Sequence, residues 1–322
     1  MKRALCLFLA VLLLALSVFA ADAKLERTIT VSPDAIVSFT AISPKGDLIA
    51  GACRDGQLRL WAFPSGELRQ AYSLQDQRIS SLAFSADGTW LAAGGNRGAV
   101  KIWSLPSGQV KHDLKVGVSV LALALSPDKT LLAVAKQEQP AELWDLDVGR
   151  VITELPAKFS GSLALDFSPD GQWLASADAD TEIRIYESHT GALRATASDL
   201  LLETFAVTFS SDSKYLYAGG ADKTISVIDV GSGKIVRSFP KQSYVIGEMH
   251  HSADGKSLVA VYFDENSVKN PAPAMVWDVA GQSVRATFAE PGITPNGSGF
   301  LKDGRVLITG GSGPKLNIWS LR

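Results

Sequence analysis

The hydrophobic and polar positions of the chain follow a pattern that returns seven times between Ser43 and Trp319. Each copy has a short apolar run, a polar turn such as Ser-Pro-Asp-Gly, a second apolar run, and then a Trp or a substitute for it. The turns begin at Ser43, Ser85, Ser126, Ser168, Ser210, Ser252 and Leu301, so each step is 41 or 42 residues except the last, which is 49. A period near 42 built from short strands and turns is typical of a β-propeller blade and not of a helical repeat.

The second copy shows most clearly how one unit should fold. Ile79–Phe84 alternates apolar and polar residues, Ser85–Gly88 supplies turn residues, and Trp90–Ala93 begins another strand. A third strand is expected at Ala99–Trp103 and a fourth at Val110–Leu114, after a second Gly-containing turn. The pattern therefore predicts four antiparallel strands in each unit.

A large residue closes the third strand of every unit and should fill the space between neighbouring sheets. These residues are Trp61, Trp103, Trp144, Tyr186, Ile228, Trp277 and Trp319. A single four-stranded sheet cannot cover both of its apolar faces, so neighbouring sheets are expected to stack face to face. Burying one Trp removes about 150–250 Å² from water, which is roughly 4–6 kcal/mol before entropy is counted.

The two ends of the repeat array predict how the ring closes. The seventh unit stops at Trp319–Arg322, directly after its third strand, and lacks the outer strand of the other units. Leu25–Val31 aligns with Glu67–Ser73, which is the fourth strand of the first unit. We expect the N-terminal strand to complete the last sheet and so remove an exposed edge. The fold class expected is an all-β, seven-bladed propeller of four-stranded antiparallel blades.

Several motifs resemble the WD40 repeat family over nearly all of the chain after residue 23. They are Leu82–Gly88, Leu165–Gly171, the Trp-Asp pairs at Trp144 and Trp277, and the Ile-Trp pairs that end at Trp103 and Trp319. The resemblance implies a seven-bladed propeller that works as a binding scaffold. The degenerate copies are similar to exported bacterial propellers.

The family's buried polar network is reduced in this chain. In the family, an Asp in the tight turn before the Trp joins a His and a Ser or Thr; here that Asp appears as Asp55, Asp180 and Asp222, and the Gly-His pair is absent. The resemblance therefore implies blades that are held together mainly by apolar packing.

The first residues have the pattern of an export signal. Met-Lys-Arg precedes an apolar run from Ala4 to Phe19, and small residues suited to cleavage follow at Ala20 and Ala23. This predicts a signal peptide over residues 1–23, a propeller over residues 24–322, and a periplasmic or secreted protein. The alternative, a retained anchor, is disfavoured because the run is shorter than the roughly 20 residues that span a bilayer. No membrane span is then expected after cleavage.

Charge and cysteine content exclude several classes of partner and cofactor. The 31 basic and 33 acidic residues give a net charge of −2, without the basic excess that indicates nucleic-acid binding. After cleavage Cys53 is the single cysteine, so neither an internal disulfide nor a Cys-based zinc or haem site is expected. Cys53 is interpreted as a small buried residue, with a reactive thiol as the alternative.

Residues that could carry chemistry are few. The chain has four His and no Gly-x-Ser-x-Gly elbow, phosphate-binding loop or His-Glu-x-x-His motif. His251 aligns with apolar residues of the other units and is interpreted as a core residue or as a polar feature near the channel. Asp178, Asp180 and Glu182 are three carboxylates at alternate positions, which are interpreted as a solvated loop or as ligands for a hard cation. No catalytic, cofactor-binding or metal-ligating residue is predicted.

The sixth copy carries the strongest departure from the repeat. Its turn-to-Trp distance is 25 residues where every other copy has 18, so an insertion falls within residues 263–273, between the second and third strands. Long loops on rigid scaffolds often carry contacts, although a tolerated surface insertion is the alternative. If a partner binds, we expect it to contact this segment and the same rim of the ring. The candidate partner-binding residues are Asp264, Glu265, Asn266, Lys269, Tyr244, Arg97, Arg78 and Arg54.

These observations together predict an exported, monomeric, non-enzymatic scaffold that binds a protein or a peptide and needs no cofactor. One alternative is a lactonase-like or hydrolase-like propeller enzyme, which would gather ionisable side chains with shifted pKa values at the mouth of the central channel. Another is a propeller that binds a small ligand or a metal.

Overall fold

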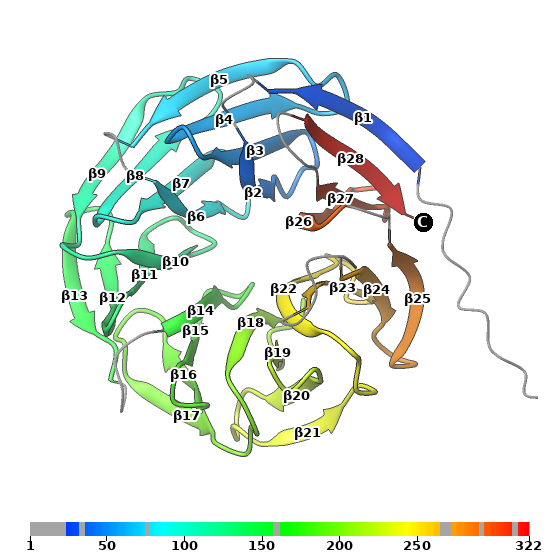
Figure 1. Ribbon diagram of the computed structural model, residues 1–322. Helices are drawn as coiled ribbons and strands as arrows, with labels where there is room; N and C mark the ends of the chain where they lie inside the picture. Colours follow the sequence, from blue (N-terminus) through cyan, green and yellow to red (C-terminus); the bar gives the residue numbers. More distant parts are fainter. Residues whose placement is uncertain are drawn as a thin grey trace, which may run out of the picture.

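The computed structural model describes residues 24–31, 36–74, 78–156, 162–264, 272–289, 293–310 and 315–321. Within them, seven four-stranded antiparallel sheets surround a central axis (Figure 1). The innermost strands of neighbouring sheets contact one another around this axis. The predicted fold class is confirmed. The predicted signal peptide, residues 1–23, lies outside the described residues.

The first four blades follow one another in the chain. Blade 1 consists of β2 (Val37–Ile42), β3 (Leu48–Cys53), β4 (Gln57–Ala62) and β5 (Leu68–Ser73). Blade 2 consists of β6 (Ile79–Phe84), β7 (Trp90–Gly95), β8 (Ala99–Ser104) and β9 (Val110–Lys115). Blade 3 consists of β10 (Val120–Leu125), β11 (Leu131–Lys136), β12 (Gln139–Asp145) and β13 (Arg150–Glu154). Blade 4 consists of β14 (Ser162–Phe167), β15 (Trp173–Asp178), β16 (Ile183–Glu187) and β17 (Leu193–Ala197).

The last three blades complete the ring. Blade 5 consists of β18 (Thr204–Phe209), β19 (Tyr215–Gly220), β20 (Ile225–Asp229) and β21 (Ile235–Ser238). Blade 6 consists of β22 (Val245–His251), β23 (Ser257–Phe263), β24 (Ala274–Asp278) and β25 (Ser283–Phe288). Blade 7 consists of β26 (Pro295–Phe300), β27 (Val306–Gly310), β28 (Lys315–Leu321) and β1 (Lys24–Thr30).

The closure of the ring by the N-terminal strand is as expected. Strand β1 pairs antiparallel with β28, with Thr28 opposite Asn317 and Ile29 opposite Leu316. The Thr28 hydroxyl also donates a hydrogen bond to Asn317 Oδ1 at 2.8 Å. The edge that β28 would otherwise expose is therefore paired, and the first strand of the chain lies beside the last (Figure 1).

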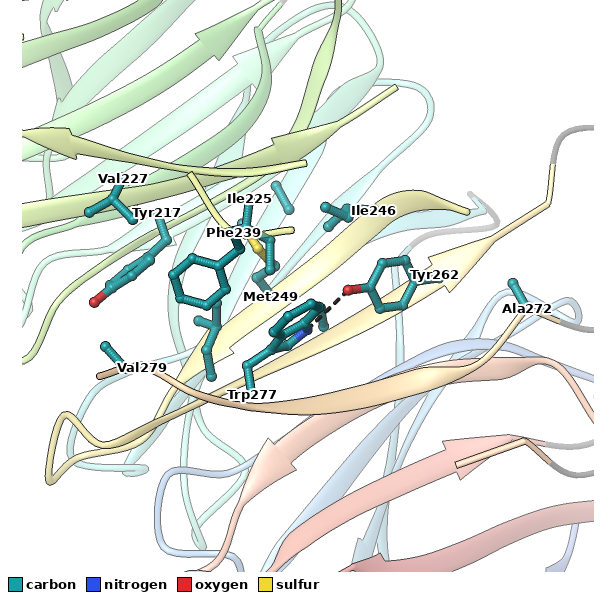
Figure 2. Packing of buried hydrophobic residues seen from close by; sticks show 13 residues of the cluster. Tyr217, Ile225, Val227, Phe239, Ile246, Met249, Tyr262, Ala272, Trp277 and Val279 are labelled. Carbon is teal, nitrogen blue, oxygen red and sulfur yellow. Dashed lines mark hydrogen bonds between the residues drawn. The ribbon is translucent and has the colours of Figure 1, made fainter. Parts of the chain in front are cut away.

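The large residue at the end of each third strand is buried between blades. Relative exposures range from 0% at Tyr186 and Ile228 to 9% at Trp144. Trp277 shows the arrangement between blades 5 and 6, since its ring centroid lies 5.4 Å from that of Phe239 (Figure 2). Its indole N–H donates to the Tyr262 hydroxyl at 3.0 Å, which satisfies the polar end of a buried side chain (Figure 2).

The Ser-x-Asp-Gly turns are held by side-chain caps. In blade 2, the Ser85 hydroxyl donates to Asp87 Oδ1 at 2.6 Å and accepts from the backbone N–H of Trp90 at 2.9 Å. Gly88 has a φ of 67°, a left-handed conformation that Gly adopts without steric cost. These short-range bonds explain why the same turn letters recur in the sequence.

The expectation that apolar packing mainly holds the blades is incomplete, because ion pairs take part as well. Asp55 binds Arg59 at 2.7 Å in blade 1, and Lys136 binds Glu142 at 2.6 Å in blade 3. In both pairs the acid and the base belong to the same blade. In blade 1 a basic side chain thus pairs with Asp55, the turn Asp to which the resemblance pointed.

The three alternate carboxylates of blade 4 form the largest of these clusters. Arg184 makes ion pairs with Asp178, Asp180 and Glu182, and its side chain is 4% exposed. The interpretation as a solvated loop is therefore wrong, since the side chains of Asp178 and Asp180 are 1% and 3% exposed. The guanidinium occupies the place that a cation would need. No group of three His, Cys, Asp or Glu side chains suited to a metal ion occurs among the described residues.

Candidate functional site

The ring has two rims that carry different loops. On the first, which we call the crossover rim, the turns between the second and third strands lie beside the segments that connect blades. The backbone N–H of Arg54 donates to the Ile36 carbonyl at 2.8 Å, and that of Asn96 donates to the Arg78 carbonyl at 2.9 Å. The opposite rim, the hairpin rim, carries the Ser-x-Asp-Gly turns. The predicted partner-binding residues within the described ranges all belong to the crossover rim.

Two of the predicted residues come together there. Arg54 and Arg78 line a cavity of about 400 Å³ with Ser38, Cys53 and Ile79. Cys53 is 3% exposed, and burial raises the pKa of its thiol. A raised pKa disfavours the reactive thiolate, so the interpretation of Cys53 as a small buried residue is confirmed.

The other predicted residues divide between two sectors. Arg97 is exposed on the turn of blade 2. Tyr244 and Asp264 flank the pair formed by Val245 and Phe263, so the two meet at one end of blade 6. Glu265, Asn266 and Lys269 lie outside the described residues. Blade 6 is therefore the sector in which two predicted residues and the predicted insertion coincide.

An apolar patch next to this sector was not foreseen from the sequence. Leu201, Leu202 and Phe263 are 81%, 50% and 39% exposed, and Leu201 is the most exposed of the large apolar side chains among the described residues. The ring of Phe205 lies 5.9 Å from that of Phe263 and joins blade 5 to blade 6. We call Leu201, Leu202, Phe205 and Phe263 the apolar patch. The run of three Leu in a connecting segment, at 200–202, was the signal in the sequence that could have found it.

Polar groups gather on the inner strands of blades 4 to 7, and those of blades 4 and 6 include ionisable side chains. Asp166, Thr208 and His250 occupy one register position, where blades 1 to 3 have Ala. Asp166 Oδ2 accepts the backbone N–H of Phe209 at 2.8 Å. His250 Nε2 and Glu248 Oε1 are 2.7 Å apart, and the same oxygen accepts the N–H of Ser298 at 3.2 Å. These bonds cross the boundaries between blades 4 and 5 and between blades 6 and 7.

The pKa values of these groups are displaced in a common direction. Burial among the inner strands raises the pKa of Asp166 to about 7. Burial opposes protonation of His250, but its hydrogen bond with Glu248 and the negative charges of Glu248 and Asp166 together raise its pKa. This is the kind of cluster that the enzyme alternative requires. The bonded oxygens of Asp166 and Glu248 are nevertheless held by groups of the next blade or of their own strand, which favours a structural role.

A pH dependence of stability follows from this cluster. Both groups hold more protons when the protein is folded, so their contribution falls as the pH rises from about 4 to 8. Asp166→Asn should remove part of this dependence and stabilise the protein by about 1–2 kcal/mol at pH 8, with little gain at pH 5. Urea unfolding at the two pH values measures the difference. An equal change at both would show that Asp166 is ionised throughout.

His251 occupies the core position that the sequence alignment indicated. Its ring stacks on Tyr217 of blade 5 at 5.3 Å, and burial lowers its pKa. Its Nε2 has no hydrogen-bond partner among the described residues. It also lines a large cavity of about 1020 Å³, which opens on the hairpin rim.

Comparisons with known proteins agree with this architecture. Residues 40–122 match the model of the anaphase-promoting complex subunit 4 WD40 domain. Residues 149–187 and 203–229 match the WD domain, G-beta repeat. No curated protein matches the chain significantly.

The seven blades and their two rims define a β-propeller of the kind that presents loops around a rigid ring. The chain thus combines family-model matches to WD40 repeats with the seven-bladed propeller that the resemblance implies. No helix in the described part of the chain is long and apolar enough to cross a membrane.

Proposed function

We propose that the protein is a non-enzymatic scaffold that binds a protein or peptide partner through the crossover rim of blades 4 to 6. The observation that carries this proposal is the apolar patch, because large apolar side chains gathered on a surface are typical of interaction sites. Tyr244 and Asp264 at the adjacent end of blade 6 would supply an aromatic and a charged contact. WD40 propellers commonly act as protein-interaction scaffolds, which agrees with this proposal.

The remaining predicted residues have secondary places in this proposal. Glu265, Asn266 and Lys269 would extend the contact from the insertion of blade 6. Arg54, Arg78 and Arg97 lie in blades 1 and 2 and would add basic contacts for a partner that reaches across the ring. The scaffold would act as a monomer.

We also propose that the protein works after export, in the periplasm or outside the cell. The support is the order of the first residues, in which Met-Lys-Arg precedes the apolar run from Ala4 to Phe19. Intact mass measurement of the protein from its native envelope tests this proposal. A mass that still includes residues 1–23 in a soluble fraction would contradict it.

Affinity capture tests the binding surface. The intact protein, a Leu201→Asp/Leu202→Asp variant and a variant lacking residues 265–271 are each used as bait in extracts of the native envelope. Both changes should reduce the yield of captured partners at least tenfold, since charge on a buried apolar contact opposes binding.

Val148→Asp provides the matched control, because Val148 is 61% exposed but lies in blade 3, between β12 and β13. Its yield should equal that of the intact protein. If all four baits recover the same proteins in equal amounts, the apolar patch and the insertion do not carry the binding.

A further inference from the structure

The cavity on the hairpin rim is lined by one unusually small residue of blade 6, Ser257. In five blades the first residue of the second strand is large. These residues are Leu48, Trp90, Leu131, Trp173 and Tyr215. The corresponding residue of blade 6 is Ser257, which pairs with Asp278 as Trp90 pairs with Ser104. The side chain that covers this place in other blades is therefore absent.

Two other blades show what the large residue does. The Trp90 ring lies 5.6 Å from that of His112 on its own outer strand, and Lys129 Nζ of the next blade's turn lies 5.4 Å from its centroid. In blade 5, Tyr215 lies 5.8 Å from the guanidinium of Arg237. The aromatic ring thus fills the corner between its own sheet and the neighbouring turn.

In blade 6 this corner is open. Arg285 of the outer strand donates from its Nη1 to the Ser257 hydroxyl at 2.8 Å, and both residues line the cavity of about 1020 Å³. The cavity extends from His250 on the inner strand, past the turn of blade 7, to Arg285. It is a groove between blades 6 and 7, bordered also by Ile42, Ser43 and Pro44 of blade 1, and a Trp side chain at residue 257 would cover its end beside Arg285.

The lining of the groove is basic. It contains Lys256, Arg285, Lys302 and Arg305, against Asp254 and Asp303. Arg305 is bound by Asp303 at 2.8 Å and by Glu26 at 3.1 Å. The carboxylate of Asp254 accepts the Ser252 hydroxyl at 2.7 Å, so it is engaged in its own turn. Lys256, Arg285 and Lys302 therefore supply the positive charge of the groove.

We propose that the groove between blades 6 and 7 binds an extended acidic peptide segment, with its carboxylates on Arg285, Lys256 and Lys302. Three basic side chains from three separate segments are complementary in charge to a ligand with several carboxylates. The volume is at the upper end of that of ligand sites, about 300–1,000 Å³, and far exceeds a single carboxylate. Ser298 and His250 also line the groove, but Glu248 Oε1 accepts the Ser298 hydroxyl at 3.3 Å and lies 2.7 Å from His250 Nε2, so the basic side chains supply the contacts to the peptide. This site is on the opposite rim from the apolar patch and does not depend on it.

Fluorescence anisotropy with a labelled hexaglutamate peptide tests the proposal. The intact protein should bind hexaglutamate and should not bind labelled hexaglutamine. Arg285→Glu/Lys302→Glu should weaken binding at least tenfold, and Ser257→Trp should do the same by displacing the Arg285 side chain and covering that end of the groove. Arg69→Glu reverses one exposed charge on the outer strand of blade 1 and should leave the affinity within twofold.

Each remaining outcome supports or overturns the site. Absence of binding to the intact protein, or equal binding by Ser257→Trp, would overturn it. Displacement of the peptide by 10 mM inorganic phosphate as effectively as by unlabelled hexaglutamate would show a general anion site and overturn the peptide assignment. If Ser257→Trp fails to fold, the loss of affinity in Arg285→Glu/Lys302→Glu decides alone. The Leu201→Asp/Leu202→Asp variant should bind hexaglutamate normally, so failure here is distinct from failure of the crossover-rim proposal.

Discussion

Replacing Ile29 by Asp should lower the free energy of unfolding by about 3–5 kcal/mol, since it deletes a buried apolar side chain and buries a carboxylate. Ile29 is 6% exposed and packs in the cluster that joins β1 to blades 7 and 1, together with Trp61 and Leu307. The strand that closes the ring therefore contributes packing on both sides of the closure. For a domain of this size the loss corresponds to a melting temperature lower by roughly 10 °C.

Leu25→Asp is the matched control, because Leu25 lies on the same strand but is 51% exposed. Its effect should stay within about 0.5 kcal/mol. Circular dichroism during heating measures both variants. A second variant that lacks residues 24–31 should open the edge of β28 and associate in a concentration-dependent way by size exclusion. Equal effects of the two Asp substitutions would show that β1 does not seal the ring.

Much of the fold could be predicted because its signals are local. A Ser-x-Asp-Gly turn caps itself through bonds within five residues, as Ser85 does with Asp87 and Trp90. In the strands on either side, apolar and polar residues alternate, and this alternation is visible in the sequence. The ring closure was also predictable, since the last unit lacks a fourth strand and the extra N-terminal strand lies one repeat before the fourth strand of the first unit. The strand bounds differ from the expected ones by only a residue or two, as at β1.

The site was harder to predict because it depends on what lies across the boundary between blades. Arg54 and Arg78 were placed correctly on one rim, since backbone hydrogen bonds tie each second-to-third-strand turn to the preceding connection. The apolar patch was missed because Leu201 belongs to an irregular connection whose exposure no periodicity reports. The sequence pattern singled out His251 as a polar feature near the channel, whereas the ionisable cluster includes its neighbour His250. Comparing the Ala of blades 1 to 3 with Asp166 and Thr208 at the same register would have found that cluster.

The buried carboxylates of blade 4 show the same limit. Their alternate spacing predicted that they share one face, but it did not show that their partner is Arg184, two residues beyond Glu182. Read alone, three acids indicate a cation site or a solvated loop. Together with Arg184, they form a buried ion cluster. Counting the basic residues within a few positions of the three acids would therefore have predicted their environment better than the acids alone.

Arg184→Met should destabilise the protein by about 3–5 kcal/mol at pH 8, since it removes the partner of carboxylates that remain buried. Burial opposes ionisation of Asp180, but its hydrogen bonds with Arg184 hold its pKa below the ordinary value. In the intact protein this group therefore stabilises the fold above about pH 4, and the contribution is lost as the pH falls. Without the guanidinium, burial dominates and raises the pKa of Asp180, so the variant should recover part of its stability at pH 5.

Urea unfolding of Arg184→Met at pH 8 and pH 5 measures this recovery. Arg194→Met, an exposed position on the outer strand of the same blade, should change the stability by less than about 0.5 kcal/mol at both pH values. Arg184→Met/Asp180→Asn should be more stable than Arg184→Met alone at pH 8, because it removes one unpaired buried charge. If Arg184→Met loses as much stability at pH 5 as at pH 8, the loss comes from packing, and the ion cluster does not set the stability of blade 4.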